Sequence, residues 1–82
     1  MAYTYILYSS VIDQYYVGCT DDLPNRVERH NKGYEKFSKR GIPWNLVYSE
    51  EFATKSEAMQ REYYIKKQKS RKYIEDLIRK KE

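Results

Sequence analysis

The sequence predicts a small α+β fold, a three-stranded antiparallel sheet flanked by helices in the order β-β-α-β-α-α. Three segments rich in aromatic and β-branched residues, 3–8, 15–18 and 44–52, are typical of strands. The polar segments between and after them carry helix-capping residues followed by apolar residues at helical spacing. With 82 residues the chain has room for one small core. We therefore expect residues 1–82 to form a single domain.

The first two strand segments are joined by the polar residues 9–14, which favours a hairpin. Side chains alternate between the two faces of a strand, so Tyr3, Tyr5 and Leu7 share one face of the first strand. Tyr16 in the second strand reaches the surface that carries Tyr5 if the register of the hairpin permits.

A helix is predicted over about Asp22 to Asn31. Thr20 and Asp21 are good N-cap residues, and Pro24 is tolerated only near the start of a helix. Arg26 and His30 are four residues apart and share one face of this helix, next to its apolar face. Both side chains could therefore act on one phosphate.

Residues 32–43 combine basic side chains with Gly33, Gly41 and Pro43, which predicts a mobile basic loop rather than a regular element. The basic residues are Lys32, Lys36, Lys39 and Arg40. A third strand follows over residues 44–52. Alternation predicts that one side of it carries Trp44, Leu46 and Tyr48, and the other Asn45, Val47 and Ser49.

Thr54 and Glu57 form a capping-box pattern, which predicts a helix from about Lys55 to about Lys69. Glu62 stands out in this helix. It lies on the stripe of Ala58 and Ile65, and burying a carboxylate without a partner is costly. Ser70 can cap a last helix, in which the apolar residues Ile74, Leu77 and Ile78 show helical spacing.

The charge of the chain is unevenly distributed. The net charge is +4. Residues 25–48 carry six basic residues and two acidic ones, whereas residues 1–24 carry three acidic residues and no lysine or arginine. Such a basic region favours a polyanionic partner, although it also serves solubility alone. The lone Cys19 excludes an internal disulfide, and the sequence shows neither a run of membrane length nor a cleavable signal, so we expect a cytoplasmic protein.

Several residues at defined spacing carry a resemblance that spans nearly the whole chain. They are the triplets Tyr5-Ile6-Leu7 and Tyr16-Val17-Gly18, Arg26 and His30 at ten and fourteen residues beyond Tyr16, and Glu62 in the predicted helix near the carboxyl end. In this order the set resembles the GIY-YIG nuclease family, in particular its small stand-alone members.

This resemblance implies a metal-dependent endonuclease that hydrolyses DNA phosphodiester bonds, with a role in DNA repair or recombination. Tyr5 would be the general base, and Tyr16 would hydrogen-bond the attacking water or the phosphate. Arg26 would stabilise charge on the phosphate, and His30 would relay a proton or hold a phosphate. Glu62 would bind a single Mg²⁺ or Mn²⁺.

The basic residues Lys32, Lys36, Lys39 and Arg40 would extend the DNA-binding surface, and the DNA could be branched or damaged. A chain of this length has no space for a separate DNA-reading domain, so a partner protein could supply specificity. Three departures from the family are present. Tyr3-Thr4-Tyr5 stands where the family name has Gly-Ile-Tyr, as in small stand-alone relatives. Cys19 stands where some repair-type members carry a lysine, and no asparagine follows Glu62. Two alternatives stay open: a nucleic-acid-binding module that keeps the fold without cutting, and a protein-interaction domain.

Overall fold

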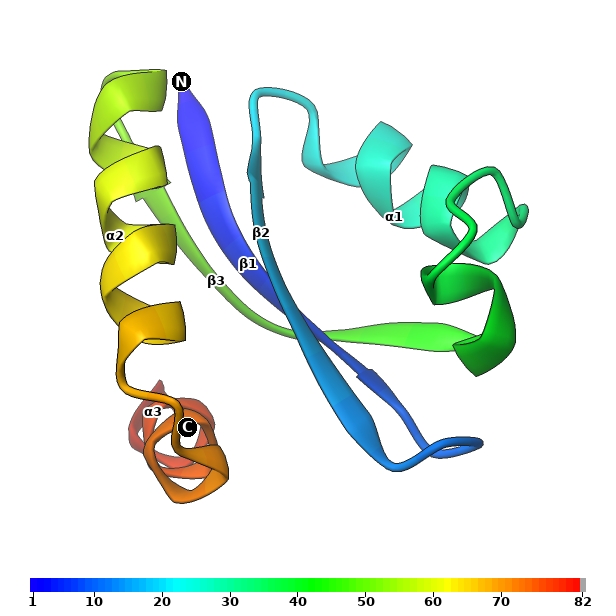
Figure 1. The fold of residues 1–82 in the computed structure, drawn as a ribbon. Coiled ribbons are helices and arrows are strands. Elements are labelled where there is room, and N and C mark those ends of the chain that lie inside the picture. Colours follow the sequence, from blue (N-terminus) through cyan, green and yellow to red (C-terminus); the bar gives the residue numbers. More distant parts are fainter. Residues whose placement is uncertain (82) are drawn as a thin grey trace.

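The computed structural model describes residues 1–81 and has the predicted order of strands and helices. Its elements are β1 (Ala2–Ser9), β2 (Gln14–Thr20), α1 (Leu23–Asn31), η1 (Ser38–Gly41), β3 (Trp44–Phe52), α2 (Lys55–Lys67) and α3 (Arg71–Lys81). The strands form one antiparallel sheet in the order β2-β1-β3, so β1 is central and β2 is an edge strand. Helix α1 lies on one side of the sheet and α2 on the other (Figure 1). Within residues 1–81, no helix has the length and apolar character needed to cross a membrane.

The central strand β1 is buried on both faces and separates two apolar clusters. On the side of α2 and α3, Ile6 packs with Val17, Tyr48 and Ile65. The other side holds Tyr5, Leu7 and Trp44, against which Tyr16, Leu23, Val27 and Ile42 pack. These two clusters anchor helices to both faces of the sheet, because each face offers a row of apolar side chains.

The hairpin register puts the two motif tyrosines on the same face, as the alternation allowed. Leu7 pairs with Tyr16 and Tyr5 pairs with Gly18. The ring centroids of Tyr5 and Tyr16 are 6.4 Å apart. A Cβ at Gly18 would lie 2.5 Å from the Tyr5 hydroxyl oxygen, closer than real atoms approach. Glycine is therefore needed in β2 at this position, because any side chain would displace the tyrosine ring.

The predicted faces of β3 were wrong, and a β-bulge is the reason. Leu7 pairs with Leu46, but Ile6 pairs with Tyr48, so the register shifts by one residue at Val47. An extra residue reverses the alternation beyond it. Trp44 consequently packs on the α1 side of the sheet and Tyr48 on the opposite side, although their even spacing predicted a shared face.

Capping decides where the helices begin and end. Asp22, rather than Thr20 or Asp21, is the N-cap of α1, and its side chain accepts a hydrogen bond from the Asn25 amide at 3.3 Å. The capping box of α2 is present as predicted. Helix α2 ends at Lys67, before the predicted Lys69, which adopts a left-handed conformation with a φ of 49°.

The basic loop was predicted to lack a regular element, but it contains the short 3₁₀ helix η1. Ser38 and Gly41 of this helix are buried. The indole Nε1 of Trp44 donates a hydrogen bond of 2.6 Å to the Ser38 carbonyl, and a Cβ at Gly41 would lie 2.5 Å from the Trp44 ring. The loop is thus fastened to the core by the first residue of β3.

Asn31, at the end of α1, fastens the same region from the other side. Its amide nitrogen donates to the Trp44 carbonyl at 3.0 Å, and its amide oxygen accepts from the Trp44 amide at 2.6 Å. The Asn31 side chain therefore satisfies both the N–H and the C=O of Trp44. At this edge of the sheet, no neighbouring strand among residues 1–81 could bond them.

Replacing Asn31 with alanine should destabilise the fold by about 2–4 kcal/mol, because two backbone groups lose their partner in a partly buried place. Chemical denaturation followed by circular dichroism measures this change. The control is Asn45→Ala, which removes an exposed asparagine from the same strand and should cost less than about 0.5 kcal/mol. Equal effects of the two changes would show that the contacts with Trp44 contribute nothing.

Candidate active site

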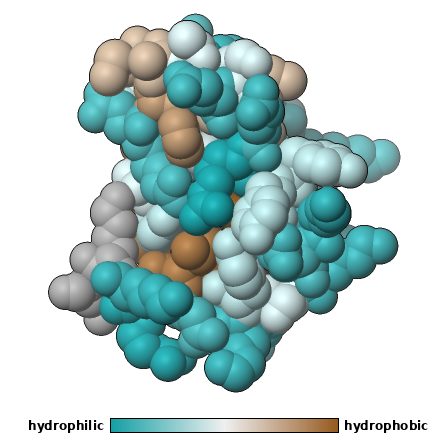
Figure 2. Space-filling view, turned by 90° about the vertical axis from the view of Figure 1, so that its left-hand side faces the viewer, coloured by the Kyte–Doolittle hydropathy of each residue, from teal (hydrophilic) through white to brown (hydrophobic). Residues whose placement is uncertain are grey.

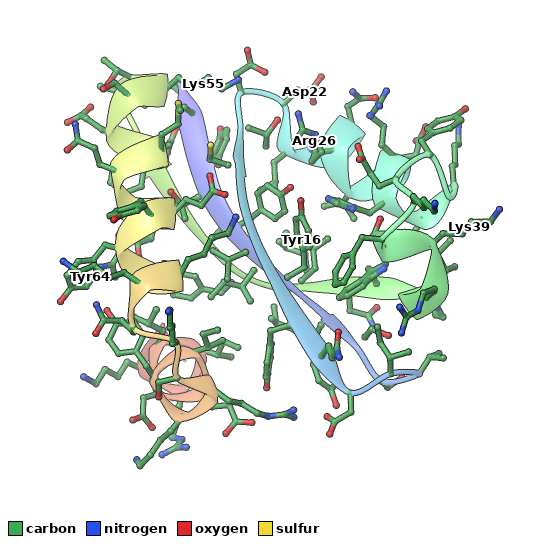
Figure 3. The ribbon with its side chains drawn as sticks, viewed as in Figure 1. Tyr16, Asp22, Arg26, Lys39, Lys55 and Tyr64 are labelled. Atoms are coloured by element: carbon green, nitrogen blue, oxygen red, sulfur yellow. The ribbon has the colours of Figure 1, made fainter. Side chains whose placement is uncertain are left out.

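All five side chains identified in the sequence come together around the Tyr5 hydroxyl, beside β2. Tyr5 comes from β1, Tyr16 from β2, Arg26 from α1 and Glu62 from α2. The charges of Arg26 and Glu62 both act on the Tyr5 hydroxyl. In Figure 3, Tyr16 and Arg26 lie in the space between β2 and α1. Residues from opposite faces of the sheet can meet here because β2 has no neighbouring strand on its outer side.

The Tyr5 side chain is fully buried. Its pKa is raised to about 12, mainly by burial and also by the nearby Tyr16, while a hydrogen bond from Arg26 and its positive charge oppose the rise. A pKa of about 12 leaves roughly one phenolate in 10⁵ molecules at pH 7. Tyr5 can therefore take up a proton only if it gives up its own at the same time.

His30 provides an acceptor for that proton. The hydroxyl of Tyr5 and Nε2 of His30 are 3.2 Å apart, and the imidazole is 1% exposed. Burial lowers the pKa of His30 below its ordinary value, Arg26 and Arg29 act in the same direction, and Glu35 opposes them. The ring is therefore neutral at pH 7. It has no accessible face for a phosphate, so of the two roles predicted for His30 the geometry suits the proton relay.

Ser38 fixes which nitrogen of His30 carries the proton. The Ser38 hydroxyl donates to the Glu35 carbonyl at 3.5 Å, which leaves its oxygen to accept from Nδ1–H of His30 at 3.0 Å. In the neutral ring Nε2 is then unprotonated and accepts from Tyr5. Sequence reasoning missed Ser38, because a serine inside a basic loop gives no signal that it will be buried beside a histidine.

Arg26 lies on α1 next to these groups and is partly buried. Within residues 1–81, its guanidinium has no carboxylate within ion-pair distance, whereas Arg29, Arg61 and Arg71 each have one. A partly buried arginine that lacks a carboxylate partner keeps its donors for another anion. The predicted sharing of one phosphate by Arg26 and His30 does not fit, because His30 faces the core.

Glu62 reaches the site from α2 with 21% of its side chain exposed. One of its oxygens, Oε2, lies 2.6 Å from Nζ of Lys66 one turn later on the helix. Glu62 also lies beside Cys19 of β2. The pKa of the Cys19 thiol is raised to about 11, mainly by burial and also by a hydrogen bond to Glu62 and the charge of this carboxylate. Cys19 is therefore a neutral thiol at pH 7, neither a nucleophile nor a competing thiolate ligand.

Glu62 fits a hard divalent cation but cannot hold it alone. Among residues 1–81 no three His, Cys, Asp or Glu side chains come together as a metal cluster. A single, partly exposed carboxylate suits Mg²⁺ or Mn²⁺, since Mg²⁺ keeps several waters and takes other ligands from a substrate phosphate. The cation would have to compete with Lys66 for the carboxylate.

The four basic residues of the loop are exposed. The loop reaches Tyr16 through Phe37, whose ring centroid is 6.2 Å from that of Tyr16. Lys32 pairs with Glu28 at 2.8 Å, so part of its charge is neutralised. Lys36, Lys39 and Arg40 are exposed. Figure 3 places Lys39 at the outer edge of the molecule, well away from Tyr16 and Arg26.

Comparison with known proteins identifies the family to which this site belongs. The family model described as "GIY-YIG catalytic domain" matches residues 1–74. The chain is 46% identical over 68 residues to the UPF0213 protein YazA of Bacillus subtilis, covering 78% of this chain and 69% of the relative. It is 50% identical over 52 residues to a UPF0213 protein of Staphylococcus aureus, covering 62% of this chain and 63% of the relative.

A solved structure has the same fold. The solution NMR structure of the UPF0213 protein BH0048 from Bacillus halodurans is 35% identical in sequence and aligns with a TM-score of 0.58, covering 95% of this chain and 83% of that one. The names of these relatives state no activity. The match over residues 1–74 and the ordered tyrosine, arginine and glutamate positions show that the chain belongs to the GIY-YIG catalytic domain family, a family of nucleases.

Proposed function

We propose that the protein is a metal-dependent endonuclease that hydrolyses DNA phosphodiester bonds. The observation that supports this most strongly is the convergence of Tyr5, Tyr16, Arg26 and Glu62. They come from four different elements: two strands of the sheet and one helix on each side of it. A fold that needed these residues only for packing would have no reason to place a carboxylate and an arginine without a carboxylate partner beside a buried phenol.

In the proposed reaction, DNA binding opens the fully buried Tyr5 hydroxyl to the attacking water. The hydroxyl then accepts a proton from this water as its own proton passes to Nε2 of His30. The 3.2 Å contact between these two groups allows the transfer. Neither a phenolate nor an imidazolate forms, so the pKa of about 12 does not block the step. His30 becomes a buried imidazolium, whose Nδ1–H remains bonded to Ser38.

The remaining residues act on the phosphate. Arg26 donates hydrogen bonds to its oxygens and stabilises the charge that develops on them. Tyr16, stacked near Tyr5, hydrogen-bonds the water or a phosphate oxygen. Glu62 would hold a Mg²⁺ or Mn²⁺, which when bound neutralises charge on the phosphate and on the leaving oxygen.

By analogy with the family, we also propose a role in DNA repair or recombination. The substrate would be branched or damaged DNA, and a partner protein would supply specificity. The alternative is a module that binds nucleic acid without cutting it. One contact favours that alternative: the 2.6 Å pairing of Lys66 with Glu62, which occupies the carboxylate. Incubating the protein with duplex, nicked and branched DNA, with and without Mg²⁺ or Mn²⁺, separates the two.

Replacing Glu62 with alanine should abolish cleavage while DNA binding stays equal or becomes slightly tighter, because the change removes the metal ligand and frees the Lys66 ammonium. Cleavage is measured with metal present, and binding with metal omitted. The control Glu51→Ala removes an exposed glutamate of β3 and should leave both unchanged. Cleavage by the Glu62 variant at the parent rate would refute its assignment as the metal ligand.

Replacing Ser38 with alanine should lower the cleavage rate roughly 10- to 100-fold, the scale on which losing a partner that orients a functional histidine acts. Because His30 must be neutral to accept a proton, the parent rate should rise with pH through the lowered pKa of His30 and then level off above about pH 6.5.

In the Ser38 variant this acidic limb should shift, and ¹⁵N NMR of the imidazole should show a change in the tautomer. The control Ser10→Ala removes an exposed serine. A slower variant with an unchanged pH profile and tautomer would mean that Ser38 is merely structural.

Reversing the charges of Lys39 and Arg40 should weaken DNA binding and flatten its dependence on salt. Each phosphate contact contributes roughly −0.9 to the slope of log affinity against log salt on duplex DNA, so losing two contacts should flatten it by about two units. Reversing Lys72 and Lys80 of α3 changes the net charge equally on a different element. If both pairs give the same slope, the loop charges act only through net charge.

A further inference from the structure

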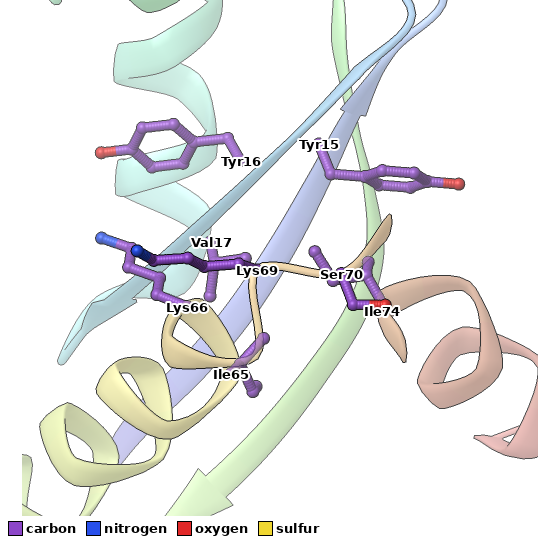
Figure 4. Close-up of a pocket in the computed structure, with 8 residues that line it drawn as sticks. All are labelled: Tyr15, Tyr16, Val17, Ile65, Lys66, Lys69, Ser70 and Ile74. Atoms are coloured by element: carbon purple, nitrogen blue, oxygen red, sulfur yellow. The ribbon is translucent and has the colours of Figure 1, made fainter. Parts of the chain in front are cut away.

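A pocket beside Tyr16 has no part in the steps described so far. It has a volume of about 280 Å³ and lies where β2 meets the junction of α2 and α3 (Figure 4). Its apolar lining includes the Tyr15 ring, Val17, Ile65 and Ile74. Two lysines, Lys66 and Lys69, also line it. Neither aspartate nor glutamate is among its lining residues.

The positive charge at this pocket has a conformational cost. Lys69 adopts a φ of 49° just after the end of α2, a position at which glycine is preferred because a Cβ is unfavourable there. Its side chain is exposed, and among residues 1–81 no acidic group pairs with it. In Figure 4, Lys66 and Lys69 extend toward the side of the pocket on which the Tyr16 ring lies. A lysine at a strained position where glycine would be favourable indicates that its ammonium group has a function.

The strand that forms one wall has free backbone groups. β2 is an edge strand, so alternate N–H and C=O groups of residues 15–17 have no strand partner on the outer side. The pocket thus combines an aromatic and aliphatic floor, hydrogen-bonding groups along one wall and two ammonium groups. A nucleotide has the matching parts, namely a flat base with polar edges and an attached phosphate.

We propose that this pocket is a subsite for the nucleotide next to the cleaved bond. Its base, unpaired from the opposite strand, enters the pocket between Tyr15 and Ile65. Its phosphate is bound by Lys69, and by Lys66 once Lys66 gives up its ion pair with Glu62. The volume of about 280 Å³ is at the small end of the range for ligand pockets, which suits a single base. This inference rests on the proposed function, since it takes Tyr16 to mark the cleaved phosphate. The rest of the face formed by α2 and α3 is mostly hydrophilic (Figure 2).

The probe is thymidine 3′,5′-bisphosphate, titrated into metal-free protein and followed by NMR. The methyl groups of Val17, Ile65 and Ile74 should shift with this nucleotide. They should not shift with 2-deoxyribose 5-phosphate, which has a phosphate but lacks a base. Shifts that are equal for the two probes, or confined to other parts of the chain, would overturn the proposal.

The decisive variant is Lys69→Gly, because it removes the ammonium from a position where glycine is favourable. Its melting temperature should equal or exceed that of the parent. The salt slope of its binding to a single-stranded oligonucleotide should flatten by about 0.7. Lys67→Ala is the matched control: it removes a neighbouring exposed lysine that does not line the pocket. An unchanged slope for Lys69→Gly, or an equal change for Lys67→Ala, would exclude Lys69 as a phosphate ligand of the subsite.

Cleavage of the same oligonucleotide is assayed separately, with metal present. If the protein cuts DNA but its pocket does not bind the nucleotide, the subsite is wrong and the endonuclease stands. If the pocket binds the nucleotide but DNA is never cut, the proposed function fails and a nucleotide-binding pocket remains. An oligonucleotide with abasic positions should bind the parent roughly 5- to 150-fold more weakly than the intact one, the range for loss of one base contact.

Discussion

The arrangement of the site depends on burying the Tyr5 hydroxyl inside the sheet without leaving it unpaired. A buried hydroxyl that lacks a partner costs about 1–3 kcal/mol, and here the partner is Nε2 of His30 at 3.2 Å. His30 in turn needs an acceptor for Nδ1–H, which is Ser38. The same phenol requires Gly18 in β2, because a Cβ there would lie 2.5 Å from its oxygen. β1, β2, α1 and η1 are therefore coupled through one side chain, and any proton that moves through Tyr5 moves within a packed core.

Charge at the site comes from both sides of the sheet. Arg26 on α1 and Glu62 on α2 act in opposite directions on the pKa of Tyr5. Lys55, also on α2, is close enough for its charge to lower the pKa of the Cys19 thiol, although burial dominates and raises it overall. Lys66 bonds Glu62 directly. Both of these cationic groups come from α2, the helix that carries Glu62.

The elements of the fold were predictable because local signals set them. The capping box of Thr54 and Glu57, and the alternation in β1, act within a few residues of sequence. The bulge at Val47 was not predictable, since it follows from how β3 pairs with β1 rather than from its own pattern. The candidate site was likewise predictable only in part. Spacing identified Tyr16 and Glu62, but the burial of His30 depends on contacts between segments distant in sequence, and no local pattern encodes such contacts.

Strand order explains why the site can exist at all. Tyr16 packs on the α1 side of the sheet, and Glu62 belongs to the helix on the other side, so the two can approach one phosphate only around the end of the sheet. Pairing β3 with the far side of β1 leaves the outer edge of β2 open. An open edge normally invites another strand to pair with it. Here such pairing would cover the edge around which Tyr16 and Glu62 approach one phosphate, so the same feature that admits a substrate requires that no second strand covers β2.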